Sequence, residues 1–89
     1  MTLQTESHAD DAADLFVDLR GLKCPEPLLM VRKTVRGMRI GEVLHVVATD
    51  PTTQRDIPQF CRFLEHALLE ARQDGEEFHF RLRKGARTS

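Results

Sequence analysis

The segment Gly21-Leu22-Lys23-Cys24-Pro25-Glu26-Pro27 joins a strand-like stretch to a long amphipathic stretch and places a thiol at the boundary. Proline suits the first turn of a helix, because its φ is already helical and the N–H that it lacks would have no partner there. We therefore predict a helix with Cys24 as its N-cap and Pro25 as its first residue. Pro27 stiffens the same turn.

The predicted place of Cys24 favours its thiolate form. A helix N-terminus carries partial positive charge and unpaired N–H groups, and both stabilise anionic sulfur. A partly ionised thiol on a rigid support is a good nucleophile, so Cys24 is the candidate catalytic residue. Five neighbours are expected to support it: Arg20, Lys23, Pro25, Glu26 and Pro27.

Both flanks of this segment show regular patterns. Residues 15–19 have strand composition, and we expect Phe16 to face the core. After Pro25 the apolar residues recur every three or four positions, which predicts one buried helical face. Those residues are Leu28, Val31, Val35 and Met38, and a turn at Gly37–Gly41 follows them.

The other sides of this helix are basic. Arg32, Lys33 and Arg36 lie there, and they either form a solvated surface or dock an acidic partner. Because a candidate nucleophile stands at the same helix, we treat these three residues as candidate docking residues.

The second half of the chain predicts a strand, a helix and a hairpin. Residues 43–48 form a nearly unbroken apolar run, typical of a central strand that pairs in parallel with residues 15–19. A helix follows, with Thr53 and Asp56 as a capping box. Because of Pro58, we expect either a first turn that tightens and restarts or a kinked helix. Asp74-Gly75 is expected to turn a hairpin between residues 68–73 and 76–84.

Two apolar sets in these elements are expected to be buried. On the helix they are Ile57, Phe60, Cys61 and Leu64, and on the last strand Phe78, Phe80 and Leu82. Cys61 is thus expected to pack in the core as a small apolar residue. The alternative is that it acts as a resolving thiol for Cys24.

The element order β-α-β-α-β-β predicts an α+β fold. Two helices on one face of a four-stranded mixed sheet would give a two-layer sandwich. We expect a disordered acidic tail over residues 1–13, a single domain over 14–85 and a short C-terminal tail over 86–89.

Composition narrows the classes of function. The chain has 89 residues and a net charge of −1, which fits one domain and disfavours a globally basic nucleic-acid binder. Its charge is uneven, because residues 1–18 contain five acids and no Lys or Arg, whereas residues 20–39 contain six cations and Glu26 as their one acid. No secretory signal or apolar span is apparent, so we expect a cytoplasmic protein with reduced thiols and no membrane partner.

The sequence suggests no cofactor. It shows no Cys-x-x-Cys pair, no zinc-spaced cysteine and histidine cluster and no glycine-rich phosphate loop, so we expect no metal and no organic cofactor. The four histidines are expected to be surface or satisfied polar residues, with His66 the one left open: His8, His45, His66 and His79.

Two blocks of residues resemble a known family. Residues 18–27, followed by residues 31–36, are similar to the Cys-Pro-x-Pro signature region of the TusA/SirA family of small sulfur carriers. A second block resembles the same family in Asp50–Thr53, Arg55–Pro58, Phe60-Cys61 and Glu65-His66, and Arg83–Gly85 resembles its end. The resemblance covers about Asp14 to Gly85, while the acidic tail is longer than the family leads us to expect.

The resemblance implies a βαβαββ fold and a sulfurtransferase. It implies that Cys24 accepts sulfur as a persulfide from a cysteine desulfurase such as IscS. The carrier would pass that sulfur to a TusBCD-type relay that serves 2-thiolation of a tRNA wobble uridine. Molybdenum-cofactor and dissimilatory sulfur routes are alternatives within the family.

Two other functions compete with sulfur transfer. A redox-active thiol protein would form a sulfenic acid or a Cys24–Cys61 disulfide. A nucleic-acid-binding regulator would bind through residues 20–39, but six cations on a near-neutral chain are few, so we expect no stable direct binding of nucleic acid.

Overall fold

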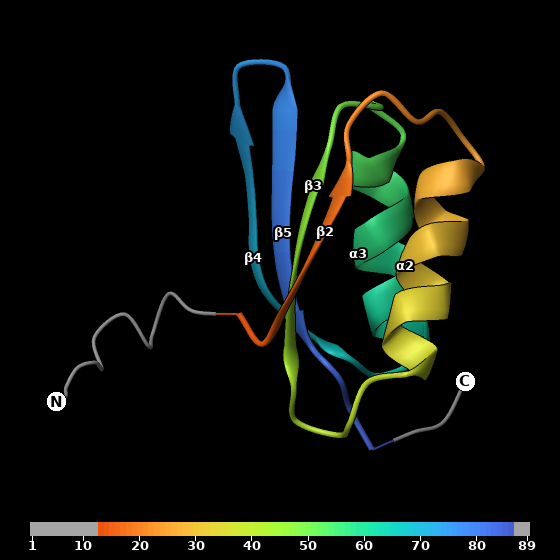
Figure 1. Cartoon of the computed structure of the whole chain (residues 1–89), viewed down its shortest axis with the longest axis vertical. Coiled ribbons are helices and arrows are strands. Elements are labelled where there is room, and N and C mark those ends of the chain that lie inside the picture. The colour runs from red at the N-terminus through yellow and green to blue at the C-terminus, as the bar shows by residue number, and fades with distance from the viewer. Residues whose placement is uncertain (1–12, 87–89) are drawn as a thin grey trace, which may run out of the picture.

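The computed structural model describes residues 13–86 of the chain, with two helices and four strands in the predicted order (Figure 1). The elements are β2 (Leu15–Leu19), α2 (Glu26–Arg36), β3 (Val43–Ala48), α3 (Thr53–Phe63), β4 (Ala67–Asp74) and β5 (Glu77–Arg83). Almost all of the predicted acidic tail and the last residues of the C-terminal tail lie outside the described residues. Within the described part, no helix is both long and apolar enough to cross a membrane.

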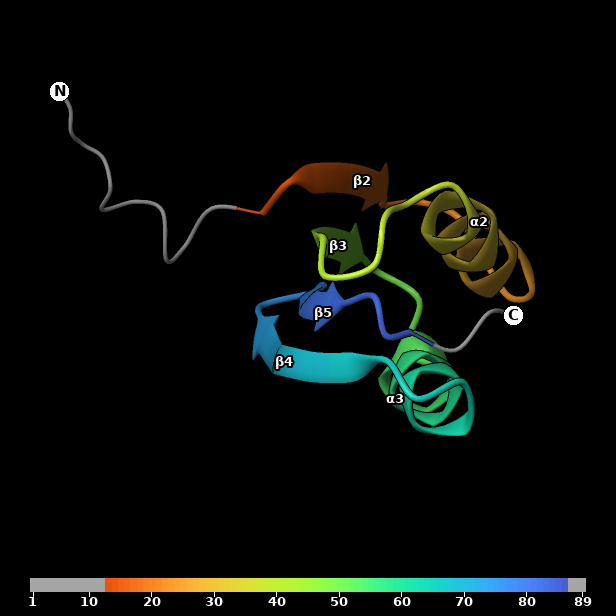
Figure 2. The same ribbon diagram turned by 90° about the horizontal axis from the view of Figure 1, so that it is seen from below.

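The four strands form one mixed sheet in the order β2-β3-β5-β4. β2 and β3 are parallel, whereas β5 is antiparallel to both β3 and β4. Both helices pack on the same side of this sheet, as the view from below shows (Figure 2). The predicted α+β sandwich is confirmed, and the face of the sheet opposite the helices, which we call the open face, is not covered by any described element.

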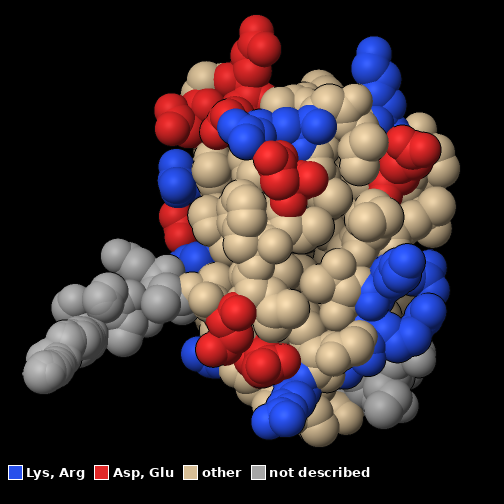
Figure 3. All heavy atoms as spheres, viewed as in Figure 1, with Lys and Arg blue, Asp and Glu red and all other residues tan. Residues whose placement is uncertain are grey.

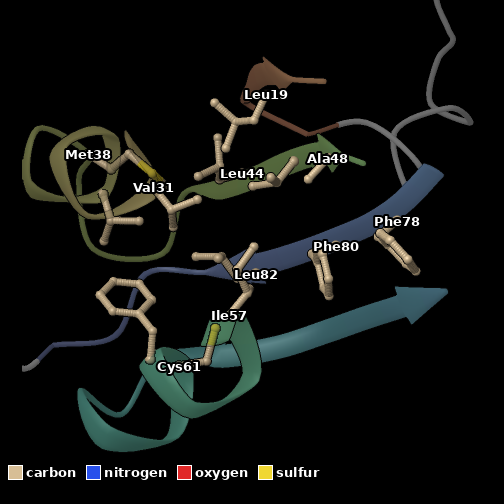
Figure 4. Close-up of a cluster of buried hydrophobic side chains, with 13 residues drawn as sticks. Leu19, Val31, Met38, Leu44, Ala48, Ile57, Cys61, Phe78, Phe80 and Leu82 are labelled. Carbon is tan, nitrogen blue, oxygen red and sulfur yellow. The ribbon is translucent and has the colours of Figure 1, made fainter. Parts of the chain in front are cut away.

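The core lies between the two layers (Figure 4). Alternate residues of the two central strands point into it, and one face of each helix meets them. Its members include Val31, Val35, Leu44, Val46, Ile57, Cys61, Phe78, Phe80 and Leu82, all of them buried. The predicted buried faces of the two helices and of the last strand are therefore confirmed.

Phe16 does not face the core, and that prediction is wrong. Its side chain is 60% exposed on the open face, where its ring makes an edge-on contact with His45 at a centroid distance of 5.2 Å. Successive side chains of a strand alternate between the two faces. Leu15, Val17 and Leu19 pack on the core side, so Phe16 must point away from it.

The second helix differs from its predicted start. Thr52 is the N-cap, and its side chain makes no capping hydrogen bond to the helix. Asp56 does not complete a capping box, because its carboxylate instead bonds the Nε of Arg55 at 2.9 Å. α3 runs through Pro58 as a single helix, without the predicted restart.

The hairpin turn lies one residue later than predicted. Asp74 pairs with Glu77, so the loop consists of Gly75 and Glu76 rather than Asp74 and Gly75. Gly75 occupies this loop with φ of 64°, a conformation that glycine adopts without steric cost.

Candidate functional site

The candidate nucleophile lies in the loop that joins β2 to α2, at the upper end of the molecule in Figure 1. Cys24 is exposed, and its thiol is free. The helix begins at Glu26, with Pro25 as N-cap, so the prediction of Cys24 as N-cap is wrong by one residue. The reason lies in the hydrogen bonds: the carbonyl of Pro25 accepts the N–H of Leu29 at 3.2 Å, which makes Pro25 the residue that opens the helix.

The backbone on the other side of Cys24 is also fixed. Gly21 has φ of 86°, a left-handed conformation that its missing Cβ permits. Its N–H donates to the hydroxyl oxygen of Thr49 at 2.9 Å. The loop is therefore tied to the residues that follow β3.

Asp50 makes the second tie, and it reaches Cys24 itself. One carboxylate oxygen accepts the backbone N–H of Cys24, and the other accepts the N–H of Thr52 at 3.1 Å. The hydrogen bond from Thr52 and then that from Cys24 hold the pKa of Asp50 below its usual value, and the charge of Lys23 adds to this. Asp50 is thus an anion that positions the backbone beneath the thiol.

Sequence reasoning missed Asp50, although a signal was available. β2 and β3 are parallel, so their carboxyl ends lie at one edge of the sheet and the loops after them meet. Cys24 stands in the first of these loops and Asp50 in the second. The predicted parallel pair could have brought the two together.

Arg20 was predicted to support Cys24, but its side chain bonds two carboxylates instead. Its guanidinium bonds both oxygens of Asp18, at 2.9 and 2.8 Å, and also Glu77 at 3.1 Å. These contacts lower the pKa of Asp18 to about 2 and raise that of Arg20. Two carboxylates therefore offset its charge, and its support of Cys24 stays a prediction.

Arg55 is a further cation that sequence reasoning did not assign. Its pKa is raised, chiefly by the hydrogen bond to Asp56, with a small electrostatic contribution from the Cys24 side chain. Arg55 belongs to the first turn of α3, which follows the loop that Asp50 ties to Cys24. Lys23, which directly precedes Cys24 in the chain, is exposed.

The candidate docking residues lie on one exposed side of α2. Arg32, Lys33 and Arg36 are all exposed, and basic side chains gather over the C-terminal half of this helix (Figure 3). In the described part of the chain their cationic groups have no acidic partner. Leu29 is 54% exposed and lies one turn from Pro25, so apolar and basic surface adjoin near the thiol.

The second cysteine has different surroundings. Cys61 is 1% exposed in the core, as predicted, and burial raises its pKa to about 12. A thiol that is buried and protonated is a poor nucleophile. Its place in the core argues against a role as resolving thiol for Cys24.

The three histidines within the described range make internal contacts. His66 is 5% exposed, and its Nδ1 accepts the N–H of Gly85 at 2.9 Å. On the open face, His45 Nε2 and His79 Nδ1 lie 3.0 Å apart, and His79 Nε2 lies 3.0 Å from Glu77. The carboxylate can only accept, so in the uncharged pair His79 donates to Glu77 and His45 donates to His79.

The described residues contain no cluster of three or more His, Cys, Asp or Glu side chains that could hold a metal ion. What the site offers is one accessible sulfur on a fixed backbone, with cations nearby. This arrangement suits nucleophilic attack by the thiolate on an external partner.

Comparison with known proteins agrees with this chemistry. The family model described as "Sulfurtransferase TusA" matches residues 15–84. Among solved structures, a SirA-like protein from Desulfitobacterium hafniense superposes with a TM-score of 0.69. The match covers 80% of this chain and 97% of that protein at 16% sequence identity, and at that identity it shows a shared fold.

Proposed function

This chain belongs to the TusA/SirA family, whose activity is sulfur transfer, and we propose that it carries sulfur as a persulfide on Cys24. The single observation that supports this most is the contrast between its two cysteines. Cys24 is exposed on a loop that Asp50 and Thr49 hold in place, whereas Cys61 is buried in the core. One sulfur is therefore open to a partner protein.

The loading step is a displacement at sulfur. The thiolate of Cys24 attacks the terminal sulfur of a persulfide on a donor protein, and a new sulfur–sulfur bond forms. The donor's own sulfur–sulfur bond breaks, and its electron pair leaves with the donor cysteine as a thiolate. Atoms and charge balance without an added oxidant, by the logic of thiol–disulfide exchange.

The unloading step repeats the same chemistry. An acceptor thiolate attacks the outer sulfur of the Cys24 persulfide, and Cys24 leaves as a thiolate ready for another cycle. Lys23 and Arg55 favour the anionic forms of the sulfur in both steps. Neither step requires a metal or an organic cofactor.

The donor in this proposal is a cysteine desulfurase of the IscS type, and the acceptor is a TusBCD-like relay in the cytoplasm. The final product would be the 2-thiolated wobble uridine of tRNA. Arg32, Lys33 and Arg36 form the basic surface that steers these partners toward Cys24. Exposed apolar side chains such as Leu29 lie on the same helix as this basic surface.

The test is loading by a desulfurase with free cysteine, followed by intact mass measurement. The chain should gain one sulfur atom, and Cys24→Ala should gain none. Cys61→Ala is the matched control, since it removes the other thiol and should load like the original chain. Gain of oxygen instead of sulfur, or equal loading of Cys24→Ala, would reject the proposal.

A further inference from the structure

β4 is the outermost strand at one side of the sheet, and one of its two edges has no partner strand. In the order β2-β3-β5-β4 it pairs with β5 alone, and no other strand among residues 13–86 lies beside it (Figure 1). It is also the longest strand in the described part of the chain, with eight residues and no proline. The N–H and C=O groups along its outer edge can therefore bond a further strand.

The hairpin fixes which backbone groups of β4 point outward. Asp74 pairs with Glu77 across a two-residue loop, and a loop of this length is closed by a hydrogen-bonded pair. Because backbone groups alternate in direction along a strand, those of every second residue before Asp74 also point toward β5. The N–H and C=O of Ala71 and Gln73 therefore point away from the sheet.

The side chains of β4 are open as well. Seven of its eight residues are exposed, among them Leu68 at 37% and Leu69 at 39%. Ala71 is exposed although Phe80, its neighbour on β5, is buried, so the helix layer leaves this part of the strand uncovered. The strand thus offers apolar side chains together with unpaired backbone groups.

The charges of β4 suit pairing with a copy of itself. Glu70 and Arg72 lie on the same face of the strand, where the Glu70 carboxylate bonds the Arg72 guanidinium at 2.8 Å. When two antiparallel copies pair with Ala71 opposite Ala71, Glu70 of each copy lies opposite Arg72 of the other. Opposite charges in facing positions stabilise a strand pair. A register centred on Glu70 or on Arg72 instead places like charges opposite each other, which is destabilising.

We propose that β4 pairs with β4 of a second copy of this chain, antiparallel and centred on Ala71. The outward N–H and C=O of Ala71 bond the same groups of the second copy, and Glu70 and Arg72 form two equivalent ion pairs across the two-fold axis. The two sheets then join into one continuous sheet. Cys24 follows β2, at the far edge of each sheet, so both thiols stay accessible. The pairing does not depend on whether Cys24 carries sulfur.

Exchange of the two charges tests the pairing and its register. In sedimentation velocity under reducing conditions, the full-length chain should shift from monomer to dimer as its concentration rises. Glu70→Arg and Arg72→Glu each place like charges at the facing positions, so each variant alone should stay monomeric. An equimolar mixture of the two variants should form dimers again, because every facing pair then has opposite charges. Arg36→Glu is the control, since it reverses a charge exposed on α2 and should dimerise like the original chain.

Hydrogen exchange locates the contact in the original chain. The amide of Ala71 points outward, so it should exchange fast in the monomer and become protected as the dimer forms. The amide of Arg72 points toward β5 and should be protected at every concentration. Because this measurement needs no substitution, it decides the proposal even if a charge variant fails to fold.

Three results would overturn the proposal. A full-length chain that stays monomeric up to millimolar concentration rejects a second copy as the partner of this edge. Dimers that both single variants form as readily as the original chain place the contact elsewhere. Dimers that the folded single variants lose and their mixture does not regain reject the register centred on Ala71.

Discussion

The Asp50 carboxylate accepts the backbone N–H of Cys24, so a residue 26 positions further along the chain fixes the backbone of the proposed sulfur carrier. The same carboxylate accepts the N–H of Thr52 at the start of α3. One side chain therefore joins the Cys24 loop to the second helix. This junction holds the thiol in place without burying it.

Replacing Asp50 should separate positioning from charge. Asp50→Ala removes the acceptor, and we expect loading of Cys24 to slow by roughly tenfold, because a hydrogen bond to a charged group is lost. Asp50→Asn keeps one acceptor oxygen, which can serve the N–H of Cys24 or that of Thr52 but not both, so its loading rate should lie between those of the alanine variant and the original chain. Initial rates measured by mass spectrometry distinguish the two. If Asp50→Ala loads at the original rate, Asp50 does not position the loop.

Charge reversal on α2 should weaken binding of the donor. Arg32→Glu with Arg36→Glu is expected to reduce desulfurase affinity by about tenfold at low salt, with a smaller loss at high salt. Arg83→Glu is the control, since Arg83 is exposed on the open face of the sheet. Titration calorimetry at two salt concentrations gives the comparison. Unchanged affinity of the double variant would remove the steering role.

Two glycines should respond differently to alanine. A Cβ at Gly85 would collide with the backbone carbonyl of Glu65, whereas a Cβ at Gly37 would lie at an ordinary 3.7 Å from the Thr34 carbonyl. Gly85→Ala should lower the free energy of unfolding by about 2 kcal/mol, because backbone must move to admit the methyl group. Gly37→Ala should change it little. Urea unfolding of both variants measures the difference, and equal stabilities would contradict the close approach.

Acidification should destabilise the fold through its histidines. Burial lowers the pKa values of His45 and His66 below 6.5, with His79 and Lys84 as additional causes respectively. Below pH 6.5 these two histidines bind protons in the unfolded chain, whereas in the native chain they stay uncharged until a lower pH. Their contribution to the free energy of unfolding is therefore fully present above pH 6.5 and decreases below it.

The measurement is urea unfolding between pH 7.5 and about 5, above the range in which carboxylates titrate. The free energy of unfolding should decrease across this interval. His45→Gln with His66→Gln should flatten the profile. An equally steep profile in the double variant would assign the effect to other groups.

Periodicity predicted most of the fold. The three-and-four spacing of Leu28, Val31 and Val35 gave the buried face of α2, and the alternation from Phe78 to Leu82 gave that of β5. These patterns are local, so they can be recognised in the sequence. The two predictions that fail here are also local: Phe16 points away from the core because Leu15, Val17 and Leu19 occupy the core side, and Pro25 rather than Cys24 is the N-cap of α2.

The parts of the site that sequence missed depend on pairing between distant segments. Asp50 meets Cys24 only because β2 and β3 are parallel and end together. Arg20 forms a hydrogen bond with Glu77, 57 positions away, because β5 pairs with β3 in the sheet. Side-chain partners of this kind follow from strand order and register, which periodicity does not specify.

The central claim is that Cys24 holds the transferred sulfur, and peptide mapping of the loaded protein tests it most directly. After reaction with a desulfurase and alkylation, tandem mass spectrometry should place the extra sulfur on Cys24 alone, and an added acceptor thiol should remove it. Sulfur found on Cys61, or sulfur on Cys24 that no acceptor thiol can discharge, would contradict the account.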